Sequence, residues 1–271
     1  IRGDGQDSMK SREAALLSFD PVADATRIDE AAADDLFAVV DLLDGQPPLR
    51  RSLSDPSASP GNRQVLARRL FDNRLGAAAL AVLLEVVGTP WPSGRAMVDA
   101  IERQGLRGLL RTAIDRGELK RIQEELYRFA QVIESSPELS DALRDPVRSL
   151  DARKALISRL LAGKAAALTQ RLALRAAAAR ARTVSLTLAS YLVLAAALAG
   201  ERIAQVTVAR PLDEAREERL RRALEARVGG PVSLQIEVDE KVLGGMSITL
   251  GEHIFESTVA GRLDEARRLL N

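Results

Sequence analysis

Residues 119–161, LKRIQEELYRFAQVIESSPELSDALRDPVRSLDARKALISRLL, decide the fold of this chain. Apolar side chains recur every three or four residues in the first part, with charged residues between them, which predicts an amphipathic helix. The inner stripe consists of Leu119, Ile122, Leu126, Phe129, Val132 and Ile133. Pro137 interrupts this helix, Asp145-Pro146 stops the helical turn that follows, and Ser149 can cap a second helix. The segment therefore predicts two helices joined by a short helical turn.

The same pattern occurs 90 residues earlier in the chain. When Leu36 is aligned with Leu126, no gap is needed to bring the later positions into agreement. The matched pairs are Pro47 with Pro137, Leu49 with Leu139, Leu53 with Leu143, Asp55-Pro56 with Asp145-Pro146, Ser59 with Ser149, and Arg63 with Arg153. Chance similarity between leucine-rich helices would not reproduce the proline, Asp-Pro and arginine positions, so we interpret the helical part as a duplication. Because two such helices cannot bury their apolar faces alone, each copy is expected to form a helical bundle.

The composition excludes most common active sites. The 271 residues include 39 Lys and Arg against 38 Asp and Glu, a net charge of +1, which argues against a dedicated nucleic-acid binder. The chain has no cysteine and one histidine, so disulfides, thiolate zinc sites and paired-histidine metal sites cannot be built. Only 3% of the residues are aromatic, and alanine and leucine, which favour helices, are abundant. We therefore expect a structural protein with no catalytic residue, cofactor or metal.

Two stretches bear on membrane contact. Thr183–Gly200 carries no charge and is long enough for a membrane span. Its serine, threonine and alanine content instead favours a buried core helix. Residues 1–10 are polar and glycine-containing, unlike a signal peptide, which needs an apolar central region. We therefore expect that no part of this chain inserts into a membrane.

Beyond residue 200 the pattern changes from helical to mixed. Alternating and β-branched residues predict strands, and Gly251-Glu252 predicts a hairpin turn before the last of them. The expected strands are 203–208, 232–238, 246–250 and 253–255, and the expected helices are about 212–227 and 258–270. The inner face expected for the first helix is Leu212, Ala215, Leu220, Ala223 and Leu224. Together these elements predict a small α/β module.

In combination these motifs resemble the delta subunit of F-type ATP synthases, called OSCP in mitochondria. The resemblance covers about Gly105 to Asn271 and depends on the 119–161 unit and three later segments. These segments are VTVARPL at 206–212, IEVDEKVLGGMSI at 236–248, and Ser257-Thr258-Val259 with Arg262-Leu263. The residues that carry the C-terminal signature are Pro211, Asp239, Leu243, Gly244 and Gly245. The extra helical copy resembles actinobacterial subunits with a duplicated helical domain. The resemblance leaves two alternatives, a separate delta subunit or the delta part of a fusion behind a stator b subunit, and the sequence upstream of Ile1 would distinguish them.

We therefore expect a mainly α fold, with two related helical bundles followed by a small C-terminal α/β module. The expected divisions are a polar lead-in over 1–10, a first bundle over 11–104, a second bundle over 105–200 and the module over 201–271.

The resemblance implies a non-catalytic stator of a proton-translocating ATP synthase. Such a subunit holds the N-terminal helices of the alpha subunits in the catalytic head and the b and b-prime subunits of the stalk, and resists rotor torque. It lies peripherally at the cytoplasmic face of the bacterial plasma membrane. A soluble helical adaptor or an RNA-binding regulatory protein is the alternative.

The family's groove for the alpha-subunit helix lies between the first and fifth helices of a bundle. In the second copy the corresponding residues are Leu109, Leu110, Ile114, Leu168 and Leu172. In the first copy they are Leu16, Leu17, Leu80, Leu83 and Leu84. Apolar ridges suit a helix-in-groove contact, but each of these residues also fits ordinary bundle core. The sequence does not indicate which copy binds the head.

Four other features have simpler interpretations than a functional site. Gly244-Gly245 lacks the further residues of a nucleotide loop and fits a sharp turn, which Asp239 is expected to cap. His253 follows a hairpin turn and has no partners for a catalytic triad. The arginines at 171, 175, 180 and 182 lack interleaved aromatic residues and fit a solvated helix face or salt bridges better than an RNA site. Trp91 is expected to close the end of the first bundle.

Overall fold

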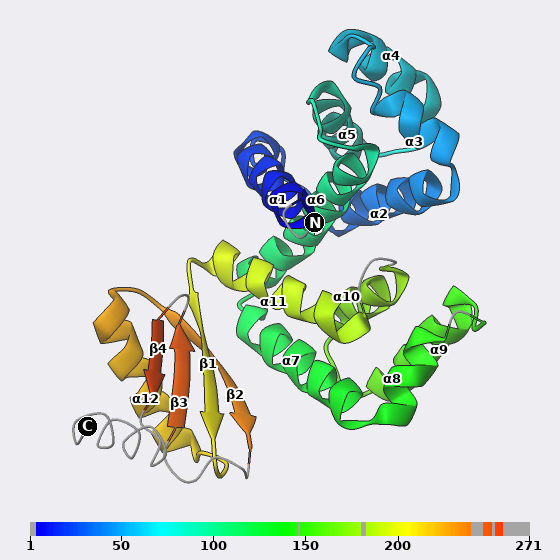
Figure 1. Ribbon diagram of the computed structural model, residues 1–271. Coiled ribbons are helices and arrows are strands. Elements are labelled where there is room, and N and C mark those ends of the chain that lie inside the picture. Colours follow the sequence, from blue (N-terminus) through cyan, green and yellow to red (C-terminus); the bar gives the residue numbers. More distant parts are fainter. Residues whose placement is uncertain (1–3, 146, 180–182, 240–245, 251–252, 257–271) are drawn as a thin grey trace. The chain divides into compact units, whose positions relative to one another are not determined.

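The computed structural model describes residues 4–145, 147–179, 183–239, 246–250 and 253–256, and the chain divides into two compact units, Ile1–Leu119 and Lys120–Asn271. Over its described residues, 4–119, the first unit contains helices and no strand (Figure 1). They are α1 (Asp4–Ala23), α2 (Glu30–Gly45), α3 (Pro47–Leu53), α4 (Pro60–Phe71), α5 (Ala77–Gly88) and α6 (Gly94–Asp115), with residue Leu119 already opening α7. The second unit combines helices and a small sheet, so the predicted mainly α fold with a C-terminal α/β part is confirmed.

The helices of the second unit repeat those of the first. They are α7 (Leu119–Ser135), α8 (Pro137–Arg144), α9 (Leu150–Leu161), α10 (Ala167–Ala178) and α11 (Val184–Ala199). Helices α4 and α9 begin and end 90 residues apart, and so do α5 and α10. Helices α6 and α11 begin 90 residues apart, each after a hydroxyl residue that caps it, Ser93 and Thr183. The offset seen in the sequence is therefore an offset between whole helices.

The turns between the helices repeat as well. Asp55 and Asp145 each accept a hydrogen bond from the backbone amide two residues later, both at 2.8 Å. Ser59 and Ser149 each accept one from the amide three residues later, at 3.3 and 3.2 Å, so both predicted helix caps are confirmed. The Asp-Pro and serine positions recur because each pair stops one helix and starts the next.

A partly buried carboxylate joins α2 to α5 in the first unit and α7 to α10 in the second. Asp35 accepts a hydrogen bond from the amide of Gly76 at 2.7 Å, and Glu125 accepts one from the amide of Ala166 at 2.8 Å. Each amide belongs to the residue that precedes a helix, where backbone donors lack partners within the helix. An anion at this end also interacts favourably with the helix dipole. The same device therefore fixes α5 in the first unit and α10 in the second.

Helix α6 packs closely against the rest of the first unit because two of its residues are glycines. A Cβ atom at Gly105 would lie 2.7 Å from the ring of Phe37, and one at Gly108 would lie 2.5 Å from Cγ2 of Ile28. The residues that surround this contact include Leu36, Val40, Leu43, Met97, Ile101, Leu109 and Leu110, all 1% exposed or less. The core of the first unit therefore lies between α2 and α6.

The predicted apolar stripe of α7 is confirmed except at one position. Leu119, Ile122, Leu126, Phe129 and Ile133 are buried, whereas Val132 is 50% exposed. Its counterpart in α2, Leu42, is 39% exposed as well. Both residues lie at the edge of the apolar stripe, next to the fully buried position that follows. The expectation that Val132 belongs to the inner face was wrong.

Helix α11 contains the uncharged run, and most of it is buried. Its nine buried residues include Leu188, Leu192 and Ala195, and Gly200 ends it in the left-handed conformation with φ of 69°. This agrees with the expected core helix. No helix in the described ranges combines the length and the apolar character that crossing a membrane requires.

The C-terminal module is a four-stranded sheet in the order β2-β1-β3-β4 (Figure 1). The strands are β1 (Arg202–Val208), β2 (Val232–Val238), β3 (Met246–Leu250) and β4 (His253–Glu256). Strands β1 and β2 are parallel and joined by α12 (Glu214–Val228), whereas β3 pairs antiparallel with β1 and β4. The predicted strands are confirmed, and the expected helix over 258–270 lies outside the described residues.

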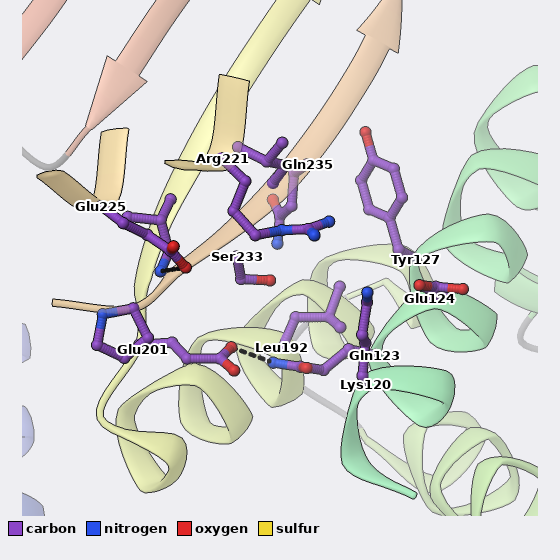
Figure 2. A pocket seen from close by; sticks show the side chains of 13 residues that line it. Lys120, Gln123, Glu124, Tyr127, Leu192, Glu201, Arg221, Glu225, Ser233 and Gln235 are labelled. Atoms are coloured by element: carbon purple, nitrogen blue, oxygen red, sulfur yellow. Dashed lines mark hydrogen bonds between the residues drawn. The ribbon is translucent and has the colours of Figure 1, made fainter. Parts of the chain in front are cut away.

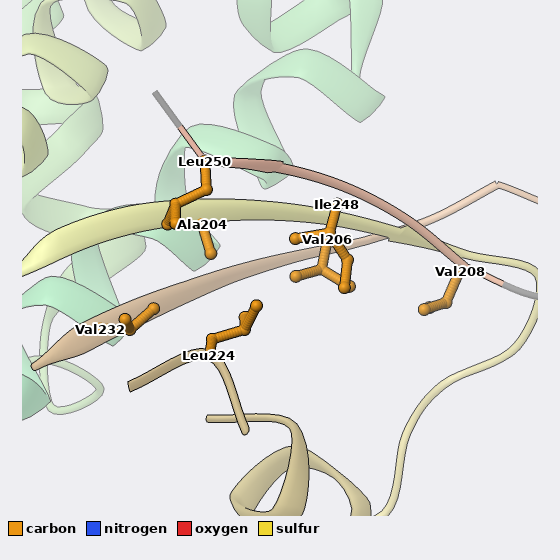
Figure 3. Close-up of a cluster of buried hydrophobic side chains, with 7 residues drawn as sticks. All are labelled: Ala204, Val206, Val208, Leu224, Val232, Ile248 and Leu250. Carbon is orange, nitrogen blue, oxygen red and sulfur yellow. The ribbon is translucent and has the colours of Figure 1, made fainter. Parts of the chain in front are cut away.

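Alternate residues of the strands form the core of the module (Figure 3). The cluster comprises Ala204, Val206, Val208, Leu224, Val232, Ile248 and Leu250. Leu212 and Leu220 pack against it, as expected, but Ala215 and Ala223 are exposed, so their assignment to the inner face was wrong. Helix α12 contributes one buried side chain, Leu224, because most of its other residues are charged. The sheet therefore supplies most of the apolar surface.

The predicted domain boundaries do not coincide with the boundary between the two compact units. Position 104/105 lies inside α6, which is continuous from Gly94 to Asp115 and belongs to the first unit. The α/β module belongs to the same compact unit as α7 to α11. Where the functional domains begin and end stays a prediction.

Candidate partner-binding surfaces

The first predicted groove involves helices α1 and α5 of the first unit. Leu17 on α1 is 55% exposed, and Leu16 and Leu80 are half-buried. Leu83 and Leu84 on α5 are 0% and 7% exposed, so they belong to the bundle core. This edge of the first unit thus presents some apolar surface to solvent, centred on Leu17.

Arginines of α6 hold helix α1 in place. The Asp20 carboxylate, 7% exposed as a residue, accepts hydrogen bonds from Arg103 at 2.6 Å and contacts Arg107 at 2.7 Å. Asp24, one turn later, pairs with Arg107 and Arg111. Burial opposes the charge on Asp24, but the two guanidinium groups outweigh it and lower the pKa of this carboxyl below its ordinary value. Helix α1 is therefore attached by charge pairs in addition to the burial of Phe19 and Ala23.

Trp91 lies where the sequence predicted it, at the end of the first bundle. Its indole nitrogen donates a hydrogen bond to the Val86 carbonyl at 2.7 Å. Its ring meets the ring of Phe19 on α1 edge-to-face, with centroids 5.5 Å apart. Because Val86 belongs to the last turn of α5, Trp91 connects α1 with α5.

The residues predicted for the second groove are mostly buried. Leu109, Leu110, Leu168 and Leu172 are at most 2% exposed, and Ile114 is 38% exposed. Leu109, Leu110 and Ile114 belong to α6 in the first unit, whereas Leu168 and Leu172 belong to α10 in the second. Their pairing as one groove stays a prediction.

The C-terminal signature lies only partly within the described residues. Pro211 is exposed between β1 and α12, and the Asp239 amide donates to the Val208 carbonyl at 2.9 Å, extending the pairing of β2 with β1. Leu243, Gly244 and Gly245 lie outside the described residues, so the turn that Asp239 is expected to cap stays a prediction. His253 is the first residue of β4 and pairs with Leu250.

The arginines at 171, 175, 180 and 182 form a basic stretch of the sequence, and the first two of them lie on α10. Arg175 is 7% exposed and engages partners within the chain, as does Arg171. Arg180 and Arg182 lie outside the described residues. Of the two expected roles, a solvated helix face does not apply to the buried Arg175, and salt bridges to acidic partner helices stay a prediction.

A pocket of about 190 Å³ lies within the second unit, where α7, α12 and β2 meet (Figure 2). Charged residues of both signs line it, including Lys120, Glu124, Arg221 and Glu225. Among the residues the structure describes, no group of three or more His, Asp or Glu could hold a metal ion. With Glu201, three carboxylates and two cations line the pocket, so its charge is nearly balanced and does not strongly favour an ionic ligand.

Tyr127 beside this pocket is a residue that the sequence interpretation missed. Its hydroxyl donates a hydrogen bond to the Ile236 carbonyl on β2 at 3.0 Å. Burial, assisted by the nearby Glu237 carboxylate, raises the pKa of Tyr127 above its ordinary value. The available signal was the alignment of Tyr127 with Phe37 in the first copy, because only tyrosine carries a donor.

Known proteins resemble this chain over nearly its whole length. The family model described as "ATP synthase delta (OSCP) subunit" matches residues 107–270. A protein named "ATP synthase subunit delta" from Nocardioides sp. is 42% identical over 240 residues, covering 89% of this chain and 87% of its own. Proteins with the same name from Streptomyces avermitilis and Cutibacterium acnes are 36% and 35% identical and cover 96% and 97% of this chain, and 96% and 100% of their own. The predicted family is confirmed: the chain belongs to the delta (OSCP) subunits of ATP synthase.

Proposed function

We propose that this protein is a stator subunit of a proton-translocating F-type ATP synthase, without a catalytic site of its own. The observation that carries the proposal is the match of the delta (OSCP) family model to residues 107–270, together with relatives of that name over most of the chain. A stator resists torque through extended interfaces, and a chain of helical bundles joined to an α/β module provides several such surfaces. The protein is then peripheral, at the cytoplasmic face of the plasma membrane.

The proposal is tested by rebuilding the complex. Membranes from a strain that lacks the protein would be stripped of the catalytic head and supplied again with the head, with or without the full chain. The expected result is that the chain restores tight attachment of the head and ATP-driven proton pumping. Equal attachment and pumping without the chain would refute the stator role.

The proposed head-binding surface is the α1–α5 edge of the first unit, and its ligand is the N-terminal helix of an alpha subunit. The support is the exposure of Leu17 at 55%, flanked by the half-buried Leu16 and Leu80, since an amphipathic helix binds through exposed apolar anchors. Of the second-copy candidates, Ile114 alone is an exposed large apolar residue, at 38%.

Binding of an alpha-subunit N-terminal peptide distinguishes the two surfaces. Leu17→Asp is expected to weaken binding by about tenfold or more, because it places a charge in an apolar contact. Val65→Asp is the matched control, since Val65 is a 50% exposed apolar residue on α4 of the same unit. Weakening by Ile114→Asp with no effect of Leu17→Asp would reject the first unit as the binding surface.

The proposed partner of the C-terminal module is the b stalk, including b-prime where present. The chain has no cysteine, so single cysteines can be introduced for cross-linking. A cysteine at the exposed Arg219 on α12 is expected to cross-link to b in the assembled complex, whereas one at the exposed Ala155 on α9 is not. Cross-linking from Ala155 alone would place the stalk on the second bundle instead.

A further inference from the structure

Strand β2 lies at the edge of the sheet, and one of its outward carbonyl groups is hydrogen-bonded by the helical bundle. The Asp239 amide bonds to Val208 of β1, and successive backbone groups of a strand point to opposite sides, so Ile236, three residues earlier, presents its carbonyl to the open edge. The Tyr127 hydroxyl donates to that carbonyl at 3.0 Å. A helix side chain therefore covers an edge group that would otherwise face solvent or another chain.

Gln131 supports this contact from the next turn of α7. Its side-chain amide donates to the Tyr127 hydroxyl at 3.0 Å and lies 3.5 Å from the Ile236 carbonyl. The tyrosine hydroxyl thus accepts one hydrogen bond while it donates another, which fixes its orientation. A third polar contact ties α7 to the start of the module, because Gln123 donates to Glu201 at 3.2 Å (Figure 2).

Charges on either side of the groove between α7 and α12 complement one another. Helix α7 lines the groove with two cations and one carboxylate, and α12 lines it with three carboxylates and one cation, so the two sides have opposite net charge. The residues are Lys120, Arg128 and Glu124 on α7, and Glu214, Glu217, Glu218 and Arg221 on α12. The pKa of the exposed Glu218 is lowered chiefly by the hydrogen bond from Arg222 and by the nearby Arg221 on its own helix, and Lys120 of α7 adds the smallest contribution in the same direction. The bundle and the module are therefore complementary beyond the tyrosine contact.

The first copy lacks these polar groups. The positions 90 residues earlier than Gln123, Tyr127 and Gln131 hold Ala33, Phe37 and Asp41. The Phe37 ring lies against Gly105 of α6 and has no hydrogen-bond donor. An acidic group in place of Gln131 could not donate to a tyrosine hydroxyl. The two copies share a fold, but only the second carries the donors that reach a strand edge.

We propose that Tyr127 and Gln131 form a latch that fixes the α/β module to the second helical bundle, so that bundle and module move as one body. The second helical bundle then binds the α/β module, and the first bundle does not take part in this contact. If the protein acts as the proposed stator, a load on the module passes directly into the second bundle. The latch itself is a property of the isolated chain and does not depend on that role.

The test measures the distance between bundle and module in the full-length protein. Spin labels would be attached to cysteines introduced at Ala155 on α9 and Ala226 on α12, both exposed and away from the groove. Tyr127→Phe removes one hydroxyl, and Gln131→Asp introduces the first copy's residue. Phe37→Tyr is the matched control, because it adds the same hydroxyl to the first unit. Helix content by circular dichroism checks that each variant folds.

The unmodified chain is expected to give one narrow distance distribution. Tyr127→Phe is expected to raise the population outside that peak roughly 3- to 10-fold, the factor that corresponds to one net hydrogen bond, and Gln131→Asp by a similar factor. Phe37→Tyr should leave the distribution unchanged. A distribution that is broad in the unmodified chain, or equally narrow in both latch variants, would overturn the proposal. Neither outcome would bear on whether the chain restores head attachment.

Discussion

Replacing Arg63 by alanine is expected to destabilise the first unit more than any exposed substitution in the same helix. Arg63 is 6% exposed, and its guanidinium donates to four backbone carbonyl groups. These belong to Val87 at 2.7 Å, Ala58 at 2.8 Å, Asp55 at 3.0 Å and Gly88 at 3.2 Å. Arg63 therefore joins the turn before α4 to the last residues of α5, where a cation also interacts favourably with the helix dipole.

The expected loss follows from the four bonds. Hydrogen bonds to a charged group contribute about 1.5 to 3 kcal/mol each, and buried acceptors that lose their donor retain a desolvation cost. The carbonyl groups at the C-terminus of α5 can recover water where the cavity opens to solvent, so the four contributions do not add. Arg63→Ala is therefore expected to lower the free energy of unfolding by about 3 to 5 kcal/mol, roughly the contribution of two of the four hydrogen bonds.

Urea unfolding followed by tryptophan fluorescence reports on the first unit, which contains Arg63. The chain has one tryptophan, Trp91, whose ring packs on Phe19 between α1 and α5. With a denaturant slope of about 1 to 3 kcal/mol per M, the midpoint should fall by about 1 M or more. Arg69→Ala, an exposed arginine on the same helix, should change the free energy of unfolding by less than about 0.5 kcal/mol. Equal shifts for the two variants would refute the assignment of Arg63 as the connecting residue.

Two further substitutions test close packing and pH dependence. Gly108→Ala is expected to destabilise the first unit by about 1 to 3 kcal/mol in urea unfolding, because its Cβ would lie 2.5 Å from Cγ2 of Ile28, whereas Gly61→Ala, with no atom within 4 Å, should not destabilise it. Burial opposes the charge of Glu125, but hydrogen bonds including that from the Ala166 amide outweigh it and lower the pKa of Glu125 below its ordinary value of 4.5. A carboxyl whose pKa is lowered by folding stabilises the folded state above its unfolded pKa, and this stability is lost as the pH falls through the folded value. Thermal unfolding of the second unit should therefore become less pH-dependent below about pH 4.5 in Glu125→Gln, and an unchanged profile would contradict this account.

The sequence predicted the helices and strands well because their signals are local. The Asp-Pro stops, the Ser59 and Ser149 caps and the alternation over 232–238 each act within a few residues. Val132 was misassigned because periodicity indicates which face of a helix is apolar, not how far neighbouring helices cover its edge. The exposure of Val132 and of Leu42 at the equivalent position depends on packing partners distant in sequence.

Contacts between distant residues could not be predicted in this way. Asp20 and Arg103 are 83 residues apart, and neither position stands out from the many other charged residues of the chain. The candidate groove residues show the same limitation. Leu17 and Leu83 have the same helical signal, yet one is 55% exposed and the other is fully buried. A single sequence indicates the type of surface but not which of its residues remain accessible.

The duplication shows which contacts belong to the bundle and which belong to one copy. The carboxylates at 35 and 125 bind equivalent amides in both copies, so this contact is part of the bundle architecture. Arg63 and Arg153 occupy equivalent positions, yet Nε of Arg63 donates to Val87 whereas Nε of Arg153 is buried without a hydrogen-bond partner in the described part of the chain. A contact present in both copies belongs to the common fold. A contact made in one copy alone can serve that copy's own neighbours, and the proposed role of Tyr127, where the first copy has Phe37, is a difference of this kind.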